Sequence, residues 1–472
     1  MVQNLIEFGY QGYIHLVGPK GGALFGHKIH PTVVDIPDPV DLASVLVPAR
    51  AVPEILRQCG EKGIRRVVVQ SGGFREMGED RLSLEDEVVQ TLRRYDMRMI
   101  GPNGIGIMNR NNGLAVPFML FRAVGEPGRT SVAAQSGGIG AMMINSLTSE
   151  NLGFSKFASM GNKLDVGEAD LLEYFLVDDA THQIYLYLEG ISNGRRLMEI
   201  ASRSTKPIVV QKANKSRPGA AMARSHSASL SADDKVVDAA FLQCGIIRVP
   251  DQRTALHCLK AFSLPQMRGP RLAVISRSGG HAVLAADAAE EFGFELPPYP
   301  QEAIHMVREY SRAGVIQLQN PMDLGDLFHL PLYRTLIEQT LAREDVDGIT
   351  FILNYNGNRA LVESRRLLGG LGEIMQKCGK PIAVCVFTVQ EEFEYLRKTL
   401  DYPIFDDPRD AVLALAMSRD RSELRPLPFS SERPTGVDAA EARRRLERLP
   451  AGPIAPESLA SILDAYGIGL VS

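Results

Sequence analysis

Residues 224–231 place a histidine, His226, between serines in a run with no large apolar side chain before its end. The preceding residues 212–221 are mostly small or basic, which is typical of an exposed loop with little to bury. A neutral imidazole on such a loop can accept a phosphoryl group and hand it on. We therefore treat His226 as a candidate phosphoryl carrier. The alternative is a solvated surface histidine with no chemical role.

A carboxylate that could orient this imidazole follows a strand-like run. Glu189 comes directly after residues 184–188, which are all aliphatic or aromatic. Ligands of doubly wound sheets bind at the carboxyl ends of strands, so Glu189 is expected at the ligand edge. It could hydrogen-bond one imidazole nitrogen of His226 and leave the other to attack phosphorus. The alternative is a solvated loop glutamate.

Two Ser-Gly-Gly sequences each follow a strand-like run and open a helix pattern. The backbone N–H groups at a helix start, with the positive end of the helix dipole, form a site for phosphate. Many α/β turns need glycine for steric reasons alone, so two matched turns carry more weight than one. If their domains pack about a pseudo-twofold axis, both starts could hold a phosphorylated His226. The residues are Ser136, Gly137, Gly138, Ser278, Gly279 and Gly280.

Residues 1–125 alternate strand-like runs with helix patterns, and turns rich in glycine or proline follow the strands. This alternation predicts a parallel, doubly wound α/β sheet. The expected strands are residues 13–17, 42–47, 67–70 and 97–100. Such a fold normally opens with a strand and a glycine-rich loop, whereas residues 2–8 read as a helix. We therefore expect this domain to lack its first strand and glycine loop.

Residues 126–427 contain an internal repeat whose parts keep a constant order. In each half a strand, Ser-Gly-Gly, a helix, a Gly-Phe pair, an Asn-x-x-Asp segment and two further strands follow one another. This order predicts two related α/β domains, 126–262 and 263–427. The alternative is the general likeness of all α/β units. Residues 428–472 read as a linker, a short helix at 456–465 and the opening of a further domain.

The composition limits the classes of function. With 45% hydrophobic and 23% charged residues, the 472-residue chain is an ordinary globular protein of about three domains. Its net charge of −4 gives no reason to expect a nucleic-acid partner. No apolar run reaches the ~18 residues of a membrane helix, and no signal peptide is recognised. Five cysteines without a CxxC pair argue against a disulfide framework or a metal site and suit the cytoplasm.

Four stretches together resemble one enzyme family. They are residues 101–106, 161–174, 187–191 and 223–230. With them the chain resembles the NDP-forming acyl-CoA synthetases, in particular the α-subunit region of ADP-forming acetyl-CoA synthetase, and more distantly succinyl-CoA synthetase. The resemblance covers nearly the whole chain. It implies a Rossmann-like CoA-binding domain at 1–125, flavodoxin-like domains at 126–262 and 263–427, and the start of an ATP-grasp domain within 428–472.

The resemblance also implies a reaction. Acyl-CoA and phosphate would give an acyl phosphate, whose phosphoryl group His226 would take and carry to ADP, all reversibly. Glu189 would steady His226, and the two Ser-Gly-Gly turns would hold the phosphohistidine. Coenzyme A would contact the segments at Lys20, Pro48, Ser71 and Asn103. ADP, ATP and Mg²⁺ would bind only through an ATP-grasp domain or subunit, of which we expect this chain to contain no more than the first residues.

The partners implied are CoA, phosphate, a small carboxylic acid, an ATP-grasp domain or subunit, and further copies of the chain in a homo-oligomer. We expect the chain to be either a separate subunit or, preferably, a fragment of a longer fused enzyme. We also expect it to bind CoA weakly, because the first glycine loop is missing. The sequence departs from the family at Ala228 and Ala232, where glycine is usual, and at His281, where a small residue is usual. Two alternatives are a CoA-binding regulatory module that has lost catalysis and the regulatory half of a protein acetyltransferase. Nothing in the sequence indicates the acyl group.

Overall fold

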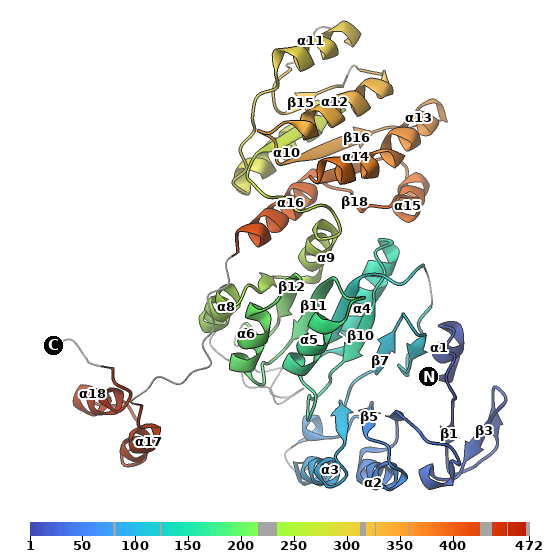
Figure 1. The fold of residues 1–472 in the computed structure, drawn as a ribbon, viewed down its shortest axis with the longest axis vertical. Coiled ribbons are helices and arrows are strands. Elements are labelled where there is room, and N and C mark those ends of the chain that lie inside the picture. Colours follow the sequence, from blue (N-terminus) through green and yellow to red (C-terminus); the bar gives the residue numbers. More distant parts are fainter. Residues whose placement is uncertain are drawn as a thin grey trace. The chain divides into compact units, whose positions relative to one another are not determined.

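The structure, a computed structural model, describes residues 1–78, 82–122, 125–215, 234–311, 318–325, 327–356, 358–424, 437–450 and 452–468 (Figure 1). Backbone contacts divide it into two compact units, Met1–Pro426 and Leu427–Ser472. The first unit contains all the strands that the structure describes.

Two separate three-stranded sheets lie within the first 100 residues. Their strands are β1 (Leu16–Val17), β2 (Ala23–Leu24) and β3 (His27–His30), in the order β1-β3-β2, and β4 (Ala43–Val45), β5 (Arg66–Val69) and β6 (Arg98–Ile100), all parallel. The helices are α1 (Val2–Glu7), α2 (Val52–Lys62) and α3 (Leu82–Arg94), with 3-10 turns at Val33–Asp35, Ala49–Ala51 and Arg75–Met77. Val67 and Val69 of β5 share a buried cluster with Leu56 of α2 and Val88 of α3. This burial explains why an apolar run between two helix patterns forms a central strand.

Most of the elements expected in this region are observed within two residues of their predicted bounds. The exception is the run 13–17, of which only Leu16 and Val17 pair as a strand. Leu16 is half-buried and Val17 is exposed, so this run lacks the burial that supports β5.

The first flavodoxin-like domain is a seven-stranded sheet in the order β13-β12-β11-β9-β10-β7-β8. Its strands are β7 (Ile107–Asn109), β8 (Leu114–Ala115), β9 (Thr130–Ala134), β10 (Lys156–Ser159), β11 (Gln183–Leu188), β12 (Ile208–Lys212) and β13 (Ile247–Val249). The helices are α4 (Gly137–Ser149), α5 (Glu168–Val177), α6 (Gly194–Ser202), α8 (Asp234–Gln243) and α9 (Gln252–Ala261). β9 to β13 are parallel and are covered on both faces, which explains their nearly continuous apolar sequences. β7 and β8 are antiparallel edge strands that precede residue 126 in the sequence.

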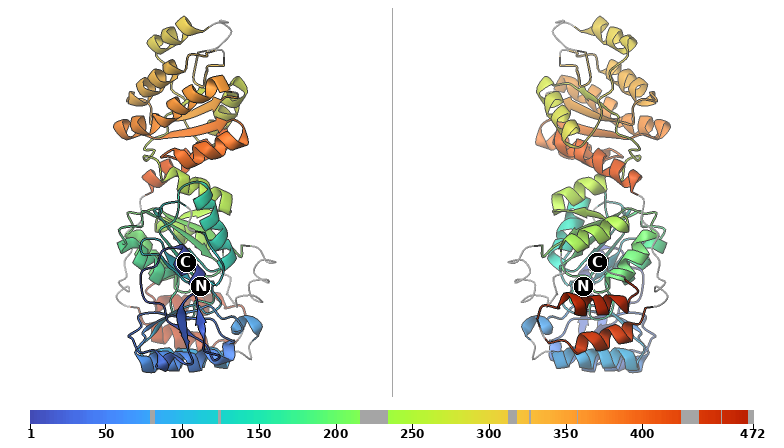
Figure 2. Two further views of the ribbon diagram at one scale, coloured as in Figure 1. Left: turned by 90° about the vertical axis from the view of Figure 1, so that its right-hand side faces the viewer. Right: turned by 90° about the vertical axis from the view of Figure 1, so that its left-hand side faces the viewer.

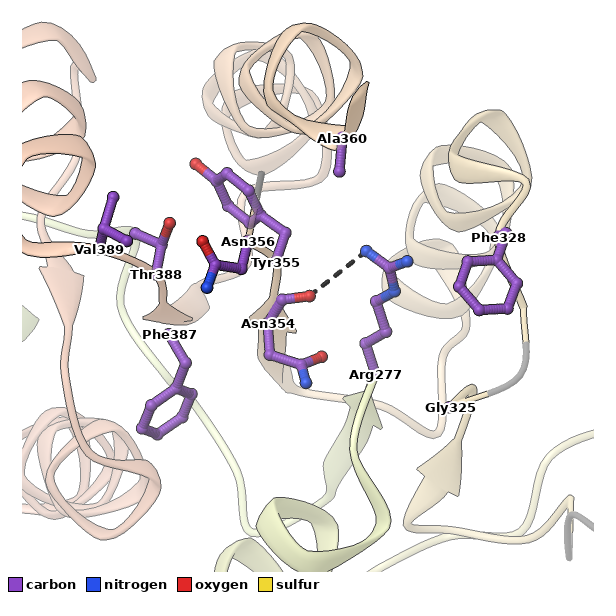
Figure 3. Close-up of a pocket in the computed structure, with 10 residues that line it drawn as sticks. All are labelled: Arg277, Gly325, Phe328, Asn354, Tyr355, Asn356, Ala360, Phe387, Thr388 and Val389. Atoms are coloured by element: carbon purple, nitrogen blue, oxygen red, sulfur yellow. Dashed lines mark hydrogen bonds between the residues drawn. The ribbon is translucent and has the colours of Figure 1, made fainter. Parts of the chain in front are cut away.

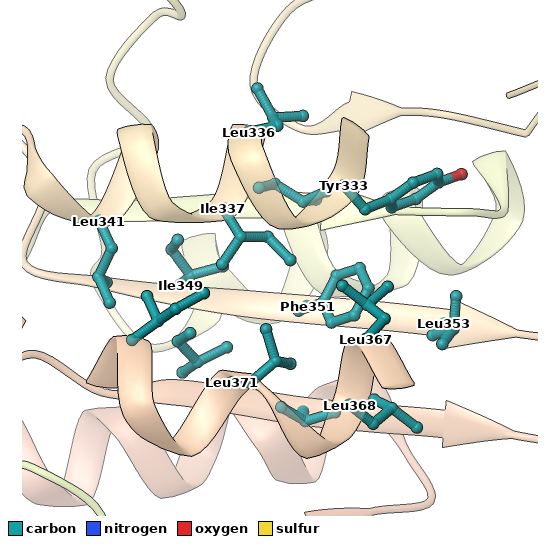
Figure 4. Close-up of a cluster of buried hydrophobic side chains, with 14 of the residues drawn as sticks. Tyr333, Leu336, Ile337, Leu341, Ile349, Phe351, Leu353, Leu367, Leu368 and Leu371 are labelled. Atoms are coloured by element: carbon teal, nitrogen blue, oxygen red, sulfur yellow. The ribbon is translucent and has the colours of Figure 1, made fainter. Parts of the chain in front are cut away.

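The second flavodoxin-like domain is a five-stranded parallel sheet in the order β15-β14-β16-β17-β18. Its strands are β14 (Leu272–Ser276), β15 (Met322–Asp323), β16 (Gly348–Asn354), β17 (Ile382–Phe387) and β18 (Ile404–Phe405). The helices are α10 (Gly279–Glu291), α11 (Gln301–Tyr310), α12 (Leu330–Ala342), α13 (Asn358–Gly369), α14 (Leu371–Cys378), α15 (Gln390–Thr399) and α16 (Pro408–Glu423). Figure 4 shows one face of β16 filled by side chains of α12, α13 and α14.

The two sheets share one topology. Numbered along the chain from β9 and from β14, the five parallel strands of each sheet lie in the order 2-1-3-4-5, which is the flavodoxin-like order. In both domains the first strand leads through a serine into a helix that begins with two glycines. This agreement supports the repeat that the sequence predicted. Between the two sheets lie α9 and α16, which pack on one another (Figures 1 and 2).

Within the unit Leu427–Ser472, the part that the structure describes forms the short helices α17 (Ala439–Glu447) and α18 (Pro456–Asp464). The backbone N–H of Asp438 donates to the carbonyl of Ala465 at 2.8 Å, and Ala442 is buried between the helices. The helix predicted at 456–465 is therefore observed.

Candidate functional site

Glu189 and the start of α4 lie together at the carboxyl edge of the first flavodoxin-like sheet. Glu189 follows β11, and Ser136 follows the neighbouring strand β9. Gln135 joins the two: its Oε1 atom accepts hydrogen bonds from the backbone N–H groups of Glu189 at 2.9 Å and of Gly190 at 3.1 Å. The structure therefore brings the candidate carboxylate and one candidate anion site to one edge.

The backbone carbonyl of Glu189 is held as well. Lys212 Nζ and Asn214 Nδ2 each donate to it at 2.9 Å. The Glu189 carboxylate is half-buried and accepts no hydrogen bond from any residue that the structure describes. Burial, followed by the charge of Glu189, raises the pKa of Tyr187 to about 12. Glu189 is thus fixed at its backbone, while its oxygens have no hydrogen-bond donor within the described residues.

The start of α4 leaves room for an anion. Ser136 is its N-cap and makes no side-chain capping bond. A Cβ atom at Gly137 would overlap Ile105, whereas one at Gly138 would meet nothing within 4 Å. Gly137 is therefore needed for packing, and Gly138 lies beside open space. The unpaired N–H groups of such a helix start suit a negatively charged group.

A pocket of about 490 Å³ opens at the carboxyl edge of the second sheet (Figure 3). Its lining residues are Arg277, Gly325, Phe328, Asn354, Tyr355, Asn356, Ala360, Phe387, Thr388 and Val389. Arg277 Nη1 donates to the carbonyl of Asn354 at 3.3 Å, and the guanidinium lies over the Phe328 ring at 5.3 Å. Arg277 follows β14 and Asn354 ends β16, the two strands between which the strand order reverses. Ligands of doubly wound sheets bind at this switch point, and the sequence had given no sign of the pocket.

The start of α10 borders this pocket. A Cβ atom at Gly279 would lie 2.7 Å from Asp323 Oδ2, whereas one at Gly280 would meet nothing within 4 Å. His281 stacks on Phe387, with ring centroids 3.9 Å apart and the planes inclined by 11°. Its Nδ1 atom is buried and has no hydrogen-bond partner among the described residues. His281 therefore forms part of the packing beneath the pocket wall.

The two Ser-Gly-Gly turns do not meet within one chain. The far end of α4 contacts the second domain, because Glu150 pairs with Arg397 of α15 at 3.4 Å. Glu150 also pairs at 2.6 Å with Lys260 of α9, in its own domain. With 13 residues α4 is about 20 Å long, so its start lies well away from this junction. α15, which carries Arg397 near its end, begins beside the pocket. Within one chain, α4 thus approaches the second domain by its far end and not by its anion-binding start.

Three of the four CoA candidates lie at the carboxyl edge of the sheet β4-β5-β6. Ser71 follows β5, and its buried hydroxyl accepts a hydrogen bond from the N–H of Val47, the neighbour of Pro48, at 3.0 Å. Asn103 follows β6, and its N–H donates to the carbonyl of Ser71 at 2.9 Å. Lys20 lies in the exposed turn between β1 and β2 of the other small sheet.

His226, Ala228 and Ala232 lie outside the described residues, so the role of His226 stays a prediction. Within the described ranges no helix is both long and apolar enough to cross a membrane. The same residues form no group of three or more His, Cys, Asp or Glu side chains that could hold a metal ion.

Comparison with known protein families agrees with this geometry. A CoA binding domain model matches residues 1–110, the region of Pro48, Ser71 and Asn103. A model described as the succinyl-CoA ligase like flavodoxin domain matches residues 127–262, the region of Glu189 and α4. The chain therefore contains a CoA-binding domain followed by a ligase-type flavodoxin domain.

Known proteins resemble the chain over most of its length. The α subunit of acetate–CoA ligase [ADP-forming] I of Pyrococcus furiosus is 35% identical, and the alignment covers 88% of this chain and 91% of the relative. Acetate–CoA ligase [ADP-forming] I of Archaeoglobus fulgidus is 32% identical over 99% of this chain and 67% of the relative. A dinucleotide-forming acetyl-coenzyme A synthetase 1 of Candidatus Korarchaeum cryptofilum, solved with phosphate and ADP, superimposes with a TM-score of 0.80 at 29% identity and covers 90% of this chain and 92% of that chain. The chain belongs to the family of ADP-forming acetate–CoA ligases, the NDP-forming acyl-CoA synthetases.

Proposed function

We propose that the chain carries the CoA and phosphoryl steps of an ADP-forming acyl-CoA synthetase. This enzyme would interconvert acyl-CoA, ADP and phosphate with a carboxylic acid, CoA and ATP. The observation that carries the proposal is Glu189, whose backbone is fixed by three side chains beside the open start of α4 while its carboxylate accepts no hydrogen bond from the described residues.

The reaction divides into three transfers that balance. A phosphate oxygen attacks the thioester carbonyl, the C–S bond breaks, and CoA leaves as a thiolate that takes up a proton. The unprotonated nitrogen of His226 then attacks the phosphorus of the acyl phosphate, and the acid leaves as a carboxylate. Finally an oxygen of ADP attacks the phosphohistidine, which gives ATP and free His226. The last transfer needs a nucleotide site, which we assign to an ATP-grasp domain or subunit with its Mg²⁺.

Glu189 would act in the second transfer. By accepting the N–H of the non-reacting imidazole nitrogen, it keeps the attacking nitrogen free of a proton and stabilises the charge that forms on the ring. The N–H groups at the start of α4, beside Ser136, Gly137 and Gly138, would hold the transferred phosphoryl group. CoA would bind at Pro48, Ser71 and Asn103, with Lys20 as a point charge for its phosphates.

The pocket beside Arg277 supplies a second anion site. Its guanidinium and the open N–H groups near Gly280 suit a carboxylate or phosphate, such as the acid product. Because α4 contacts the second domain of its own chain by its far end and not by its start, we propose that a second copy in a homo-oligomer brings its pocket to the α4 site. The residues Ser278, Gly279 and Gly280 then contribute to the same site as Glu189.

Isotope labelling tests this function in both directions. The chain is incubated with acetyl-CoA and ³²P-phosphate, or with γ-³²P-ATP and the ATP-grasp subunit of a relative. We expect an acid-labile, base-stable label that is absent from His226→Ala and present in His281→Ala. CoA binding without a label in either direction would instead favour the regulatory module. Loss of label in His281→Ala with retention in His226→Ala would identify His281 as the carrier.

A further inference from the structure

A buried ion pair lies directly behind the turn that carries Glu189. Lys163 Nζ is 2.8 Å from Glu168 Oε2, and the two side chains are only 6% and 1% exposed. Lys163 also has a left-handed φ of +53°, which residues with a side chain seldom adopt. Such strain persists only where the surrounding structure imposes it, and it is concentrated at functional sites.

Both members of this pair bind the backbone of the turn 189–192. Lys163 Nζ donates to the carbonyl of Gly190 at 2.7 Å, and Glu168 Oε1 accepts the N–H of Ser192 at 2.6 Å. Together with Gln135, which accepts the N–H groups of Glu189 and Gly190, they satisfy the turn from one side. These three nearly buried side chains, together with Lys212 and Asn214, set the position of the turn that carries Glu189.

Stability alone does not explain this pair. Taking two charges out of water costs about as much as their attraction returns, so a buried ion pair often stabilises no more than apolar residues of the same volume. Its charges do give strong and directional hydrogen bonds to the turn. These hydrogen bonds to the turn give the pair a role that the stability of the fold does not require.

The same segment reaches the CoA region through Asn162. Its Nδ2 donates to Glu76 Oε2 at 2.7 Å, and its Oδ1 accepts from Asn103 Nδ2 at 3.2 Å. Glu76 in turn accepts the N–H groups of Gly73 and Phe74, which follow Ser71. Adjacent residues of one segment thus hold the CoA loops and the Glu189 turn.

We propose that Lys163 and Glu168 are positioning residues that fix Glu189 for transfer of the phosphoryl group to His226. The inference rests on the proposed function, because it assumes that Glu189 orients His226. Neither residue contacts a reacting atom; both act through the turn. The chain provides a matched control in Lys156 and Asp178, a second buried pair of the same domain, 2.7 Å apart and 8% and 17% exposed. That pair lies at the start of β10 and the end of α5, at the opposite edge of the sheet.

The test compares the double variants K163M/E168Q and K156M/D178N in the full chain. Each removes both charges, so that neither leaves an unpaired buried charge. Hydrogen–deuterium exchange should become faster at the amides of residues 189–192 in K163M/E168Q alone. The initial rate of His226 labelling from acetyl-CoA and ³²P-phosphate should fall about 10- to 100-fold in that variant, with an unchanged KM for acetyl-CoA. In a Glu189→Gln background the same double substitution should cause no further fall.

Several outcomes would overturn the inference. Unchanged exchange in the turn would show that the pair does not hold it. An equal loss of labelling in K156M/D178N would show that removing any buried pair of this domain slows labelling. A further loss of the same size in the Glu189→Gln background would show that the pair acts independently of Glu189. If K163M/E168Q fails to fold, K163Q/E168Q is measured in the same way. Absence of label in the unsubstituted chain would overturn the proposed function, while the exchange measurement would still decide the role of the pair.

Discussion

The two flavodoxin-like domains have one topology but differ in charge at two pairs of equivalent positions. Gln135 and Arg277 each precede a Ser-Gly-Gly turn, and each donates its backbone N–H to the third parallel strand at 2.9 Å. Counted from these bonds, Glu189 in the first domain is the counterpart of Asn354 in the second. In the first domain a neutral side chain thus holds the turn that carries a carboxylate, and in the second a cation donates to the backbone carbonyl of an asparagine.

This contrast shows how a repeated scaffold can divide one reaction. A carboxylate suits the orientation of an imidazole N–H, whereas a guanidinium suits the binding of an anion. The buried Lys163 follows the same division, because the equivalent position of the second repeat is Pro321, which has no charge. The fold sets where ligands bind, and the side chains at each edge set which ligands those are.

Removal of the Glu189 carboxylate should remove the charge difference between Glu189 and its counterpart Asn354, and we expect it to have the largest effect on the labelling of His226. Glu189→Gln keeps the size of the side chain but loses its charge, so we expect His226 to be labelled about 100-fold more slowly. The initial rate of labelling from acetyl-CoA and ³²P-phosphate measures this. Glu199→Gln on α6, another acid of the same domain, serves as the control and should label at the original rate. If Glu189→Gln is labelled at the original rate, the charge of Glu189 has no role in the transfer of the phosphoryl group.

Paired glycine substitutions should show where the two domains are alike. Gly137→Ala and Gly279→Ala place a methyl group against Ile105 and Asp323, and should lower the free energy of unfolding by about 1–3 kcal/mol. Gly138→Ala and Gly280→Ala meet no neighbour and should leave it nearly unchanged. Urea denaturation of the four variants measures the difference. Equal losses of unfolding free energy for Gly137→Ala and Gly138→Ala, or for Gly279→Ala and Gly280→Ala, would contradict the division between a packing glycine and an open one in each turn.

The substitution Arg277→Gln would make the second domain resemble the first. Loss of the guanidinium should raise the KM for phosphate or acid about tenfold, equivalent to roughly 1.4 kcal/mol of binding. The KM for CoA should not change. Steady-state kinetics with an ATP-grasp partner would show this, with Arg334→Gln on α12 as the control. A rise in the KM for CoA alone would assign Arg277 to the other ligand.

Low pH should weaken the junction between the two flavodoxin-like domains, with the smallest effect of these predictions. Burial raises the pKa of Asp410, but hydrogen bonds from His257 and Arg253 outweigh it and lower the pKa from 3.8 to about 2. A lowered folded-state pKa stabilises above pH 3.8, and the contribution is lost as the pH falls toward 2. Because Arg253 is largely exposed, we expect only about 1 kcal/mol. The difference in Tm between the original chain and Asp410→Asn should therefore shrink between pH 5 and pH 2; a constant difference would contradict the shift.

The fold was largely predictable because its signals are local. Buried runs such as Thr130–Ala134 and the matched Ser-Gly-Gly turns gave the central strands and the repeat. No prediction from the sequence covered the short strands β7 and β8, because β7 joins the sheet through antiparallel pairing with the distant strand β10, and β8 in turn pairs with β7. The pocket was missed for the same reason, since Arg277, Asn354 and Phe387 come together only when three strands are aligned. Lys163 lies in the stretch 161–174 that resembles the family, but its role is not visible there, because its bond to Gly190 links residues 27 positions apart.

The junction built from α9, α16 and the Glu150–Lys260 pair has a consequence for symmetry. It joins the two sheets through helices that cover their faces, so that a chain presents two separate and unlike ligand edges. If the edge of one copy completes the opposite edge of another, a twofold pair closes on itself and contains two identical sites. Repeated head-to-tail packing without such closure would instead give an open filament, so the stoichiometry of the assembly would follow from this single junction.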